Sequence, residues 1–244
     1  MKLGILGQGR LGSSMSLLLR AAGHEVHTWV RGQPFPDCQL AWICVSDGAL
    51  AEVAAALPPG PVVLHASGAT DLSPLSSHAE HGSLHPLQSF PGPEVALPPL
   101  GGVPAAIAGT PRARALARQL AEDLGMRAFD VPGDRRLYHA SAVMAGNFAT
   151  TLLAAASQLL VEAGVPPADA PGLLAPLAIA SIRQAAERGP VQALTGPHVR
   201  GDQAVVRAHE QAILELVPEL SELYRILGEH TLCLARTFPS DEGA

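Results

Sequence analysis

The sequence predicts an α/β protein in which a doubly wound parallel sheet is followed by an all-α domain. Residues 1–131 alternate short apolar runs, typical of buried strands, with segments of helical periodicity. After residue 133 the strand patterns stop and only helical patterns remain. A glycine-rich turn, Gly7-x-Gly9-x-x-Gly12, joins the first apolar run to the first helix. We therefore expect two domains, residues 1–132 and residues 133–244.

The first domain is predicted to contain strands connected mainly by helices. The apolar runs assigned to strands are 1–6, 26–30, 40–45, 62–65, a strand with a polar turn within 82–90, 103–108 and 128–131. The helical segments between them are 11–22, 48–57 and 111–124. We expect Ser46-Asp47 to cap the second helix and Arg112, Arg114 and Arg118 to face outward from the third. Strands that alternate with helices in this way form parallel sheets.

The second domain is predicted to be entirely helical. One long Ala-rich helix is followed by one or two helices in which Pro176 is a candidate kink, then by a loop and two more helices. These segments are 134–163, 168–188, the loop 189–202, 203–216 and 218–236.

The long helix 134–163 is apolar on nearly every face, and such a helix must be buried on every face. The other helices of the domain are too few to cover it. We therefore expect a homodimer formed through the helical domain. Asn147, Gln158 and Glu162 interrupt the apolar surface, which favours a buried helix over a membrane span.

The composition limits the function further. The chain has 244 residues, of which 48% are hydrophobic, enough for two modest cores. Its net charge is -6 and its pI is about 5.9, without a basic stripe, which argues against a nucleic-acid partner. Three scattered cysteines and an N-terminus that runs directly into a strand suit a reducing cytoplasm. The histidines and cysteines lack ligand spacing, so we expect no metal site.

The glycine turn predicts a dinucleotide site because it lies between a strand and a helix, with a second strand following. Gly7 permits the tight turn, Gly9 lets backbone amides approach a pyrophosphate, and Gly12 lets the helix pack close to the strand. The alternative is a Rossmann-type unit that binds nothing there.

The end of the second strand favours NADP over NAD as the cofactor. NAD sites usually carry an acidic residue there, which bonds the ribose hydroxyls. This chain has Arg31 instead, whose guanidinium suits a 2′-phosphate. A solvated surface arginine is the alternative. The residues predicted to bind the cofactor are Gly7, Gln8, Gly9, Arg10, Leu11, Gly12, Arg31, Val45, Ser46 and Ser67.

This domain order resembles the 6-phosphogluconate-dehydrogenase-like superfamily, which includes β-hydroxyacid dehydrogenases, pyrroline-5-carboxylate reductases and prephenate dehydrogenases. Three segments, "SLHPLQSF", "YHASAVMAGNF" and "LTGPHVRGD", are more specifically similar to bacterial proteins that join a Rossmann-like domain to a C-terminal domain of unknown function. Those proteins are often labelled NADP oxidoreductases. The resemblance implies the fold strongly and the reaction weakly.

One departure from this resemblance concerns lysine. In β-hydroxyacid dehydrogenases a lysine and an asparagine lie one turn apart on the long helix. Asn147 resembles that asparagine, but Val143 stands one turn earlier. Lys2 is the only lysine in the chain, which excludes a mechanism that uses an interior lysine. His85-Pro86 resembles a His-Pro motif of some prephenate dehydrogenases.

The polar groups that could do chemistry fall in three places. Ser67 follows a strand and could contact the nicotinamide or a substrate, or simply form a turn. His85 could transfer a proton near neutral pH, or be a structural histidine. His139 and Asn147 lie eight residues apart and could share a helix face, where His139 would donate the proton and Asn147 would bind the reacting atom. The alternative for these two is packing against a second subunit.

The segment 194–202 adds Arg200 and Thr195 as candidate substrate-binding residues, with Asp202 expected to cap the next helix. We predict an NADP-dependent oxidoreductase acting on a small carbonyl, hydroxy or imine substrate. The alternative is an NADP-binding sensor without catalysis. We favour His139 over His85 as the proton donor, with Tyr138 or a water as the remaining possibility. His85 would then bind and orient the substrate or brace the His-Pro turn.

Overall fold

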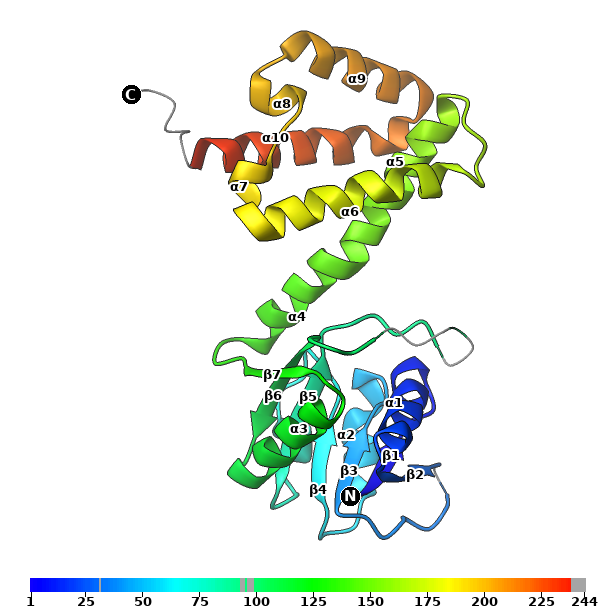
Figure 1. Ribbon diagram of the computed structural model, residues 1–244, viewed down its shortest axis with the longest axis vertical. Coiled ribbons are helices and arrows are strands. Elements are labelled where there is room, and N and C mark those ends of the chain that lie inside the picture. The colour runs from blue at the N-terminus through cyan, green and yellow to red at the C-terminus, as the bar shows by residue number, and fades with distance from the viewer. Residues whose placement is uncertain (31, 93–94, 96–98, 238–244) are drawn as a thin grey trace. The chain divides into compact units, whose positions relative to one another are not determined.

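The computed structural model describes residues 1–30, 32–92, 95 and 99–237 (Figure 1). Contacts divide the chain into two compact units, Met1–Gly146 and Asn147–Ala244, which we describe separately. The division lies within the long helix, whereas the sequence placed it after residue 132. It lies there because the first turns of this helix bond to the sheet unit through Arg135 and Tyr138.

A single twisted sheet organises the first unit. The described residues contain seven strands, in the order β2-β1-β3-β4-β5-β6-β7. Their bounds are Lys2–Leu6 (β1), Glu25–Trp29 (β2), Leu40–Ile43 (β3), Val62–His65 (β4), His81–Pro86 (β5), Pro104–Gly109 (β6) and Arg127–Asp130 (β7). This sheet confirms the predicted α/β fold class.

One strand pair departs from the predicted parallel arrangement. Neighbouring strands are parallel except β5 and β6, which pair antiparallel with His85 opposite Ala106. Parallel neighbours need a long crossover, usually a helix. The connection from β5 to β6 carries no helix among its described residues, and the chain therefore returns antiparallel.

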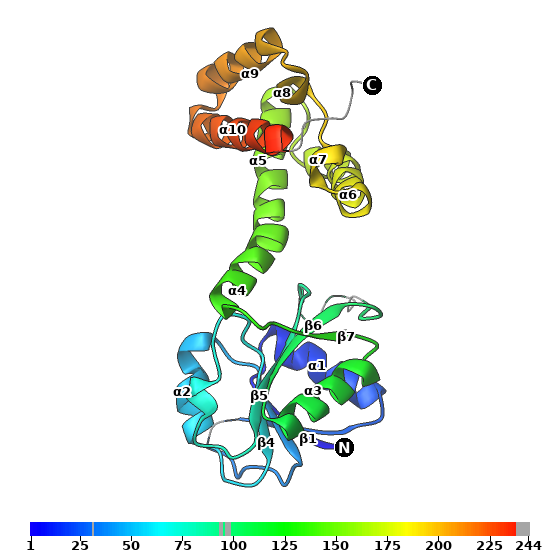
Figure 2. The ribbon, with the colours of Figure 1, turned by 90° about the vertical axis from the view of Figure 1, so that its left-hand side faces the viewer.

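Helices cover both faces of this sheet, as a doubly wound fold requires (Figure 2). The helices are Arg10–Ala21 (α1), Asp47–Ala55 (α2) and Pro111–Asp123 (α3), with a 3-10 turn at Ser73–Leu75. Met15 of α1 and Leu120 of α3 pack with Trp42 and Leu64 on one face. Leu50 of α2 packs with Ile43 on the other. Strands buried on both faces explain the continuous apolar runs in the sequence.

Among the described residues after β7, helices are the only regular elements. Their bounds are Arg135–Val143 (α4), Ala149–Glu162 (α5), Ala170–Arg188 (α6), Pro190–Ala193 (α7), Pro197–Arg200 (α8), Gln203–Leu216 (α9) and Ser221–Thr237 (α10). A π-helical turn at Met144–Phe148 joins α4 to α5, and a 3-10 turn at Pro218–Leu220 precedes α10.

Two predictions about these helices need correction. The long helix is not uniformly α-helical, because the π-turn interrupts it. The predicted loop 189–202 contains two single-turn helices, each starting at a proline that favours the first helical position. Of the one or two helices expected in 168–188, the structure has one, α6 (Ala170–Arg188), which continues through Pro176. Asp202 caps α9 as predicted, since its side chain accepts a hydrogen bond from the Val205 amide.

The helical unit leaves much apolar surface uncovered within one chain. Leu173 and Leu177 of α6 are 62% and 67% exposed, and Ala170 is the buried residue of that helix. The helical run Arg135–Glu162 is long and apolar enough to span a membrane by length and composition alone, and 6% of its most apolar window is buried. The burial expected for this helix is thus not found within a single chain.

Candidate functional site

The glycine turn between β1 and α1 has the geometry that its glycines require. Gly7 has a φ of 112°, and a Cβ there would strike the Cys44 carbonyl oxygen. A Cβ at Gly12 would strike the Gly7 carbonyl oxygen. The fold itself therefore requires glycine at both positions. Gly7 permits the tight turn, and Gly12 permits the close contact of α1 with β1.

Gly9 differs because the fold does not require it. A Cβ at this position would have no heavy atom within 4 Å, and its φ of -72° is one that any residue adopts. Gly9 is the N-cap of α1, where no side chain caps the helix and no acidic residue lies in the first turn. Gln8 and Arg10 beside it are exposed. The open space and the uncapped amides fit a bound phosphate or pyrophosphate.

The other predicted cofactor residues follow neighbouring strands. Val45 and Ser46 follow β3, and Ser67 follows β4. Since β1, β3, β4 and β5 are parallel, their carboxyl ends lie along one edge of the sheet, where ligands of open α/β sheets bind. Leu11 is half-buried at the start of α1. Arg31 lies outside the described residues.

Ser46 and Ser67, both predicted to bind the cofactor, differ in the hydrogen bonds that their side chains make. Ser46 is the N-cap residue of α2, but its side chain makes no capping hydrogen bond, which corrects the predicted cap. The Ser67 hydroxyl accepts a hydrogen bond of 2.9 Å from the Thr70 amide and so closes the turn after β4. This geometry supports the turn interpretation of Ser67.

His65, at the end of β4, is fully buried and holds the start of the same turn. Its Nδ1 accepts a hydrogen bond from the Ser67 amide at 3.1 Å, and its Nε2 donates to the Asp71 carbonyl at 3.1 Å. Both contacts suit a neutral ring. Burial, followed by the nearby Arg135 charge, lowers the pKa of His65 to about 4.

A cluster of three aromatic or imidazole side chains forms above this turn. The hydroxyl of Tyr138 lies 2.7 Å from Nδ1 of His85, and the two rings meet edge to face with centroids 5.6 Å apart. The ring of His139 lies 6.2 Å from the ring of His85. Phe129 of β7 packs on Tyr138 at 6.1 Å. We call His85, Tyr138 and His139 the imidazole–phenol cluster.

The imidazole rings of the cluster occupy space that a side chain at position 68 would fill. A Cβ on Gly68 would lie 2.6 Å from Cδ2 of His139 and 2.9 Å from Nε2 of His85. Real side chains essentially never approach a Cβ at such distances. The two imidazoles therefore converge on the backbone of the turn after β4, at the carboxyl edge of the sheet.

Arg135, at the first position of α4, connects the cluster to this turn. Its Nη2 donates to the Ser67 carbonyl at 2.8 Å, and its Nε donates to the Thr70 carbonyl at 3.1 Å. Its guanidinium carbon lies 6.0 Å from the Tyr138 ring centroid. Within the described residues, no carboxylate lies at ion-pair distance from Arg135, and its buried Nη1 lacks a hydrogen-bond partner. Arg135 thus brings a positive charge beside the cluster, on which the Asp71 carboxylate acts only from beyond ion-pair distance.

The surroundings of the cluster keep His85 and Tyr138 neutral at pH 7. Burial, followed by His139 and Arg135, lowers the pKa of His85 to about 4. Burial raises the pKa of Tyr138, although Arg135 opposes that increase. A neutral imidazole bonded to a neutral phenol can still pass a proton through its two nitrogens.

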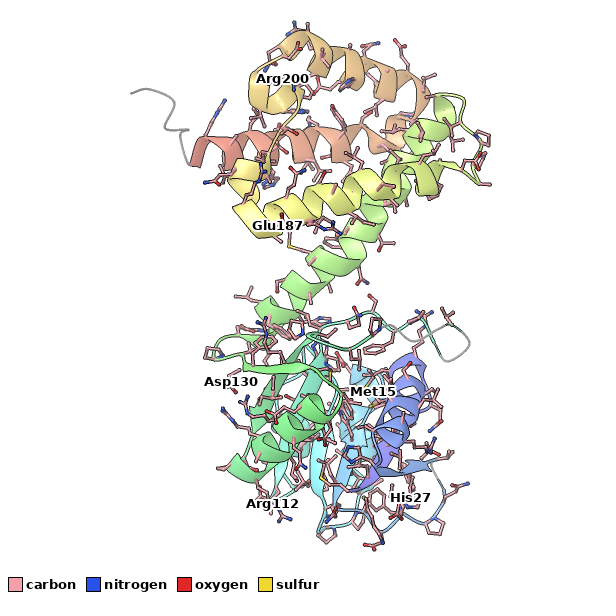
Figure 3. All side chains as sticks on the ribbon, in the orientation of Figure 1. Met15, His27, Arg112, Asp130, Glu187 and Arg200 are labelled. Atoms are coloured by element: carbon pink, nitrogen blue, oxygen red, sulfur yellow. The ribbon has the colours of Figure 1, made fainter. Side chains whose placement is uncertain are left out.

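The structure brings His85 and His139 together, but the remaining predicted residues belong to the helical unit. Asn147 is exposed within the π-helical turn. Because the prediction for Asn147 assumed a regular α-helix, its angular relation to His139 no longer follows from the spacing. Thr195 is exposed, as is Arg200, which Figure 3 shows on α8.

Sequence reasoning missed Arg135 and the contact of the imidazoles with Gly68. Arg135, Tyr138 and His139 lie at positions i, i+3 and i+4, a spacing that places them on one helix face. That spacing was the signal that could have identified Arg135. Nothing in the local sequence showed that two imidazoles would pack on Gly68, because that contact joins β4, β5 and α4.

The sheet order and the glycine turn define the class of protein as a doubly wound, Rossmann-type α/β protein with a helical C-terminal part. The chain belongs to the family described as "Domain of unknown function (DUF2520)", whose model matches residues 103–231. No curated protein sequence matched the chain.

Solved structures with the same fold span nearly the whole chain. A proposed NADP oxidoreductase from Bacteroides fragilis has a TM-score of 0.79 and 21% identity, covering 95% of this chain and 97% of its own. An imine reductase from Streptomyces aurantiacus has a TM-score of 0.63 and 14% identity, covering 97% and 99%. Pyrroline carboxylate reductase from Plasmodium falciparum, solved with NADP bound, has a TM-score of 0.59 and 10% identity, covering 96% and 98%.

Proposed function

We propose that the protein is an NADP-dependent oxidoreductase that reduces a small carbonyl or imine compound, or oxidises the corresponding hydroxy or amino compound. One observation carries this proposal. The glycine turn follows β1, and His85 of the imidazole–phenol cluster lies at the carboxyl end of β5, so both lie at the edge of the sheet where these parallel strands end. A dinucleotide held at the first would extend along that edge toward the second.

The residues present fit the cofactor. The uncapped N-terminus of α1 would hold the pyrophosphate, with Gly9 leaving space for it. Arg31 follows β2 in the sequence and would bind the 2′-phosphate of NADP. When bound, the reduced nicotinamide supplies a hydride, and the protein must supply the accompanying proton.

The fold comparisons support the same class of reaction. The similar structures include an NADP-bound pyrroline carboxylate reductase and an imine reductase, which are reductases by their names. Membership of the 6-phosphogluconate-dehydrogenase-like superfamily agrees with this fold. Because a shared fold hosts many chemistries, the comparisons support the class of reaction and leave the substrate open.

We assign the substrate-facing roles as follows. His85 and His139 are the candidate proton donors, and the cluster that contains them is the reacting end of the site. Asn147, Thr195 and Arg200 of the helical unit are proposed to bind the substrate, with Arg200 as the partner of a substrate carboxylate. The assembly is proposed to be a cytoplasmic homodimer formed through the helical part of the chain.

A second candidate function is an NADP sensor that has lost catalysis. The observation that favours it is that Lys2, on β1, is the only lysine, so the long helix lacks the lysine of β-hydroxyacid dehydrogenases. Turnover of NADPH with any member of a panel of 2-oxo acids and cyclic imines would reject the sensor.

The decisive experiment measures cofactor binding by calorimetry. We expect wild-type protein to bind NADPH more tightly than NADH. Arg31→Asp places a negative charge against the 2′-phosphate and should reverse or abolish that preference. Arg10→Asp is the comparison variant, since it puts the same charge near the pyrophosphate and should weaken both cofactors similarly. Absence of NADPH binding at millimolar concentration would reject the proposed function.

A further inference from the structure

Resting on the proposed reductase function, we propose that His85, Tyr138 and Arg135 form a proton relay. In this relay Nε2 of His85 gives a proton to the substrate, Tyr138 replaces it through Nδ1, and Arg135 stabilises the phenolate that remains. The relay assigns the donor role to His85, whereas the sequence had favoured His139.

The hydrogen bond between Tyr138 and His85 sets the tautomer of the imidazole. A phenol is a better donor than acceptor, and the unprotonated nitrogen of a neutral imidazole is a strong acceptor. The Tyr138 hydroxyl, 2.7 Å from Nδ1, therefore donates to Nδ1, and the single ring proton of His85 resides on Nε2. Nε2 faces Gly68, at the carboxyl edge of the sheet. The hydrogen bond thus places an N–H donor at the end of the site where the substrate would react.

His139 lacks a comparable proton supply. Within the described residues no hydrogen bond joins its ring to another group, whereas His85 has the Tyr138 hydroxyl behind it. A donor that loses its proton during the reaction needs a replacement, and the contacts provide one for His85 alone.

Arg135 explains why the relay includes a tyrosine. Its guanidinium lies 6.0 Å from the Tyr138 ring centroid and faces no carboxylate at ion-pair distance among the described residues. This charge opposes the protonation of His85 and favours ionisation of Tyr138. Both effects keep His85 neutral before the reaction and stabilise a phenolate after it. The other groups that act on His85 are His139, which also disfavours its protonation, and Asp47, which favours it.

The step is balanced in protons and electrons. The carbon of the substrate C=O or C=N bond receives the hydride, and its oxygen or nitrogen takes the proton as the Nε2–H bond breaks. Nδ1 takes the proton of the Tyr138 hydroxyl, which leaves a neutral His85 of the other tautomer bonded to a phenolate. After the product leaves, Nε2 takes a proton from solvent and Nδ1 returns its proton to the phenolate, which restores the starting tautomer of His85 and the Tyr138 hydroxyl.

The test measures the tautomer directly and needs no substrate. Protein labelled with ¹⁵N-histidine is examined by long-range ¹H–¹⁵N correlation between pH 4 and pH 9, with His85 assigned from its loss in His85→Gln. We expect neutral His85 with its proton on Nε2 throughout pH 6 to 9. A doubly protonated ring at pH 7, or a proton on Nδ1, would overturn the relay.

The chain contains a matched control for the tyrosine. Tyr224 is the only other tyrosine, and its hydroxyl lies 2.8 Å from Nδ1 of His209 in the helical unit. Its charged neighbour is Glu210 rather than an arginine. In ¹³Cζ-tyrosine spectra, Arg135→Gln should raise the pKa of Tyr138 and leave that of Tyr224 unchanged. An equal change in the pKa of both tyrosines, or no change in either, would show that Arg135 is not part of the relay.

The kinetic arm uses the compound from the panel of 2-oxo acids and cyclic imines that the wild type reduces fastest. Tyr138→Phe should lower kcat about a hundredfold and leave the dissociation constant for NADPH unchanged, whereas Tyr224→Phe should change neither. An unchanged kcat in Tyr138→Phe would reject the relay alone. Failure of the wild type to bind NADPH would instead reject the proposed function, whatever the tautomer of His85.

Discussion

The hydroxyl of Tyr138 lies 2.7 Å from Nδ1 of His85, although 53 positions separate the two residues in the sequence. This bond joins the first turn of α4 to the end of β5, and Arg135 on the same helix bonds to the turn after β4. The start of the long helix is therefore fixed to the edge of the sheet that carries the glycine turn. Side chains held by rigid elements and several hydrogen bonds keep the narrow geometry that proton transfer requires.

Gly68→Ala tests whether the two imidazoles need the space above the turn. The new methyl group would lie 2.6 Å from His139 and 2.9 Å from His85, so at least one ring must move. We expect a loss of about 1–3 kcal/mol in the free energy of unfolding, the usual cost of overpacking, and loss of the His85 tautomer preference. Gly48→Ala, at an exposed position of α2 where a Cβ meets nothing within 4 Å, should instead stabilise the fold. Urea unfolding and histidine NMR measure both effects.

Gly9→Ala and Gly12→Ala separate a cofactor site from a structural turn. A Cβ at Gly12 would strike the backbone of Gly7, so this variant should unfold at markedly lower urea concentration. Gly9 has open space around it, so its variant should lose less than about 1 kcal/mol, the scale of an N-cap change. NADPH affinity should nevertheless fall at least tenfold in Gly9→Ala, because the methyl group occupies the path of the pyrophosphate. Unchanged affinity would identify the glycine turn as structural only.

Much of the sheet unit could be predicted because its signals are local. Apolar runs flanked by Gly and Pro located the strands, and the Gly7-x-Gly9-x-x-Gly12 spacing located the first turn. The antiparallel pairing of β5 with β6 could not be predicted in the same way. The sequence already placed no helix between the strands within 82–90 and 103–108, and the described residues of this connection contain none, but periodicity alone does not give the direction of a strand.

The candidate site was predicted less completely than the fold. His85 and His139 were identified from their residue types, and the structure brings them together. The role of Arg135 depends on the carbonyl groups of Ser67 and Thr70, which are far from it in the sequence. The π-turn at Met144–Phe148 was missed because one extra residue per turn leaves the apolar pattern of an Ala-rich helix almost unchanged.

The buried His65 predicts an acid-dependent loss of stability. Its pKa is about 4 in the folded protein, against about 6.5 in the unfolded chain. The unfolded state therefore binds a proton below pH 6.5 that the folded state rejects until about pH 4, and stability falls as the pH decreases through this window. The full shift in pKa corresponds to a loss of about 3 kcal/mol in the free energy of unfolding.

His65→Asn removes this titration, so its free energy of unfolding should depend less on pH between 6.5 and 4 than that of the wild type. The variant also loses hydrogen bonds to the turn. It should therefore be less stable than the wild type at pH 8, where the histidine is uncharged in both the folded and the unfolded state. Urea unfolding at several pH values separates the two effects. A parallel displacement of the whole profile, with the slope unchanged, would show that His65 does not cause the acid sensitivity.

The last prediction concerns a second copy of the chain. Leu173, Leu177 and Ile182 of α6 are 62%, 67% and 59% exposed, and α5 buries only Ser157. Helices this apolar are seldom left in water, and a stable interface removes about 1,200–2,000 Å² of surface from solvent. We expect a dimer in light scattering at micromolar concentration. Leu177→Glu would bury an unpaired charge in that interface and should shift the protein toward monomers. Leu17→Glu makes the same change at an exposed apolar residue of the sheet unit and should leave the dimer intact. A monomeric wild type would contradict the prediction, as would equal dissociation in the two variants, since the α6 surface would then not be the interface.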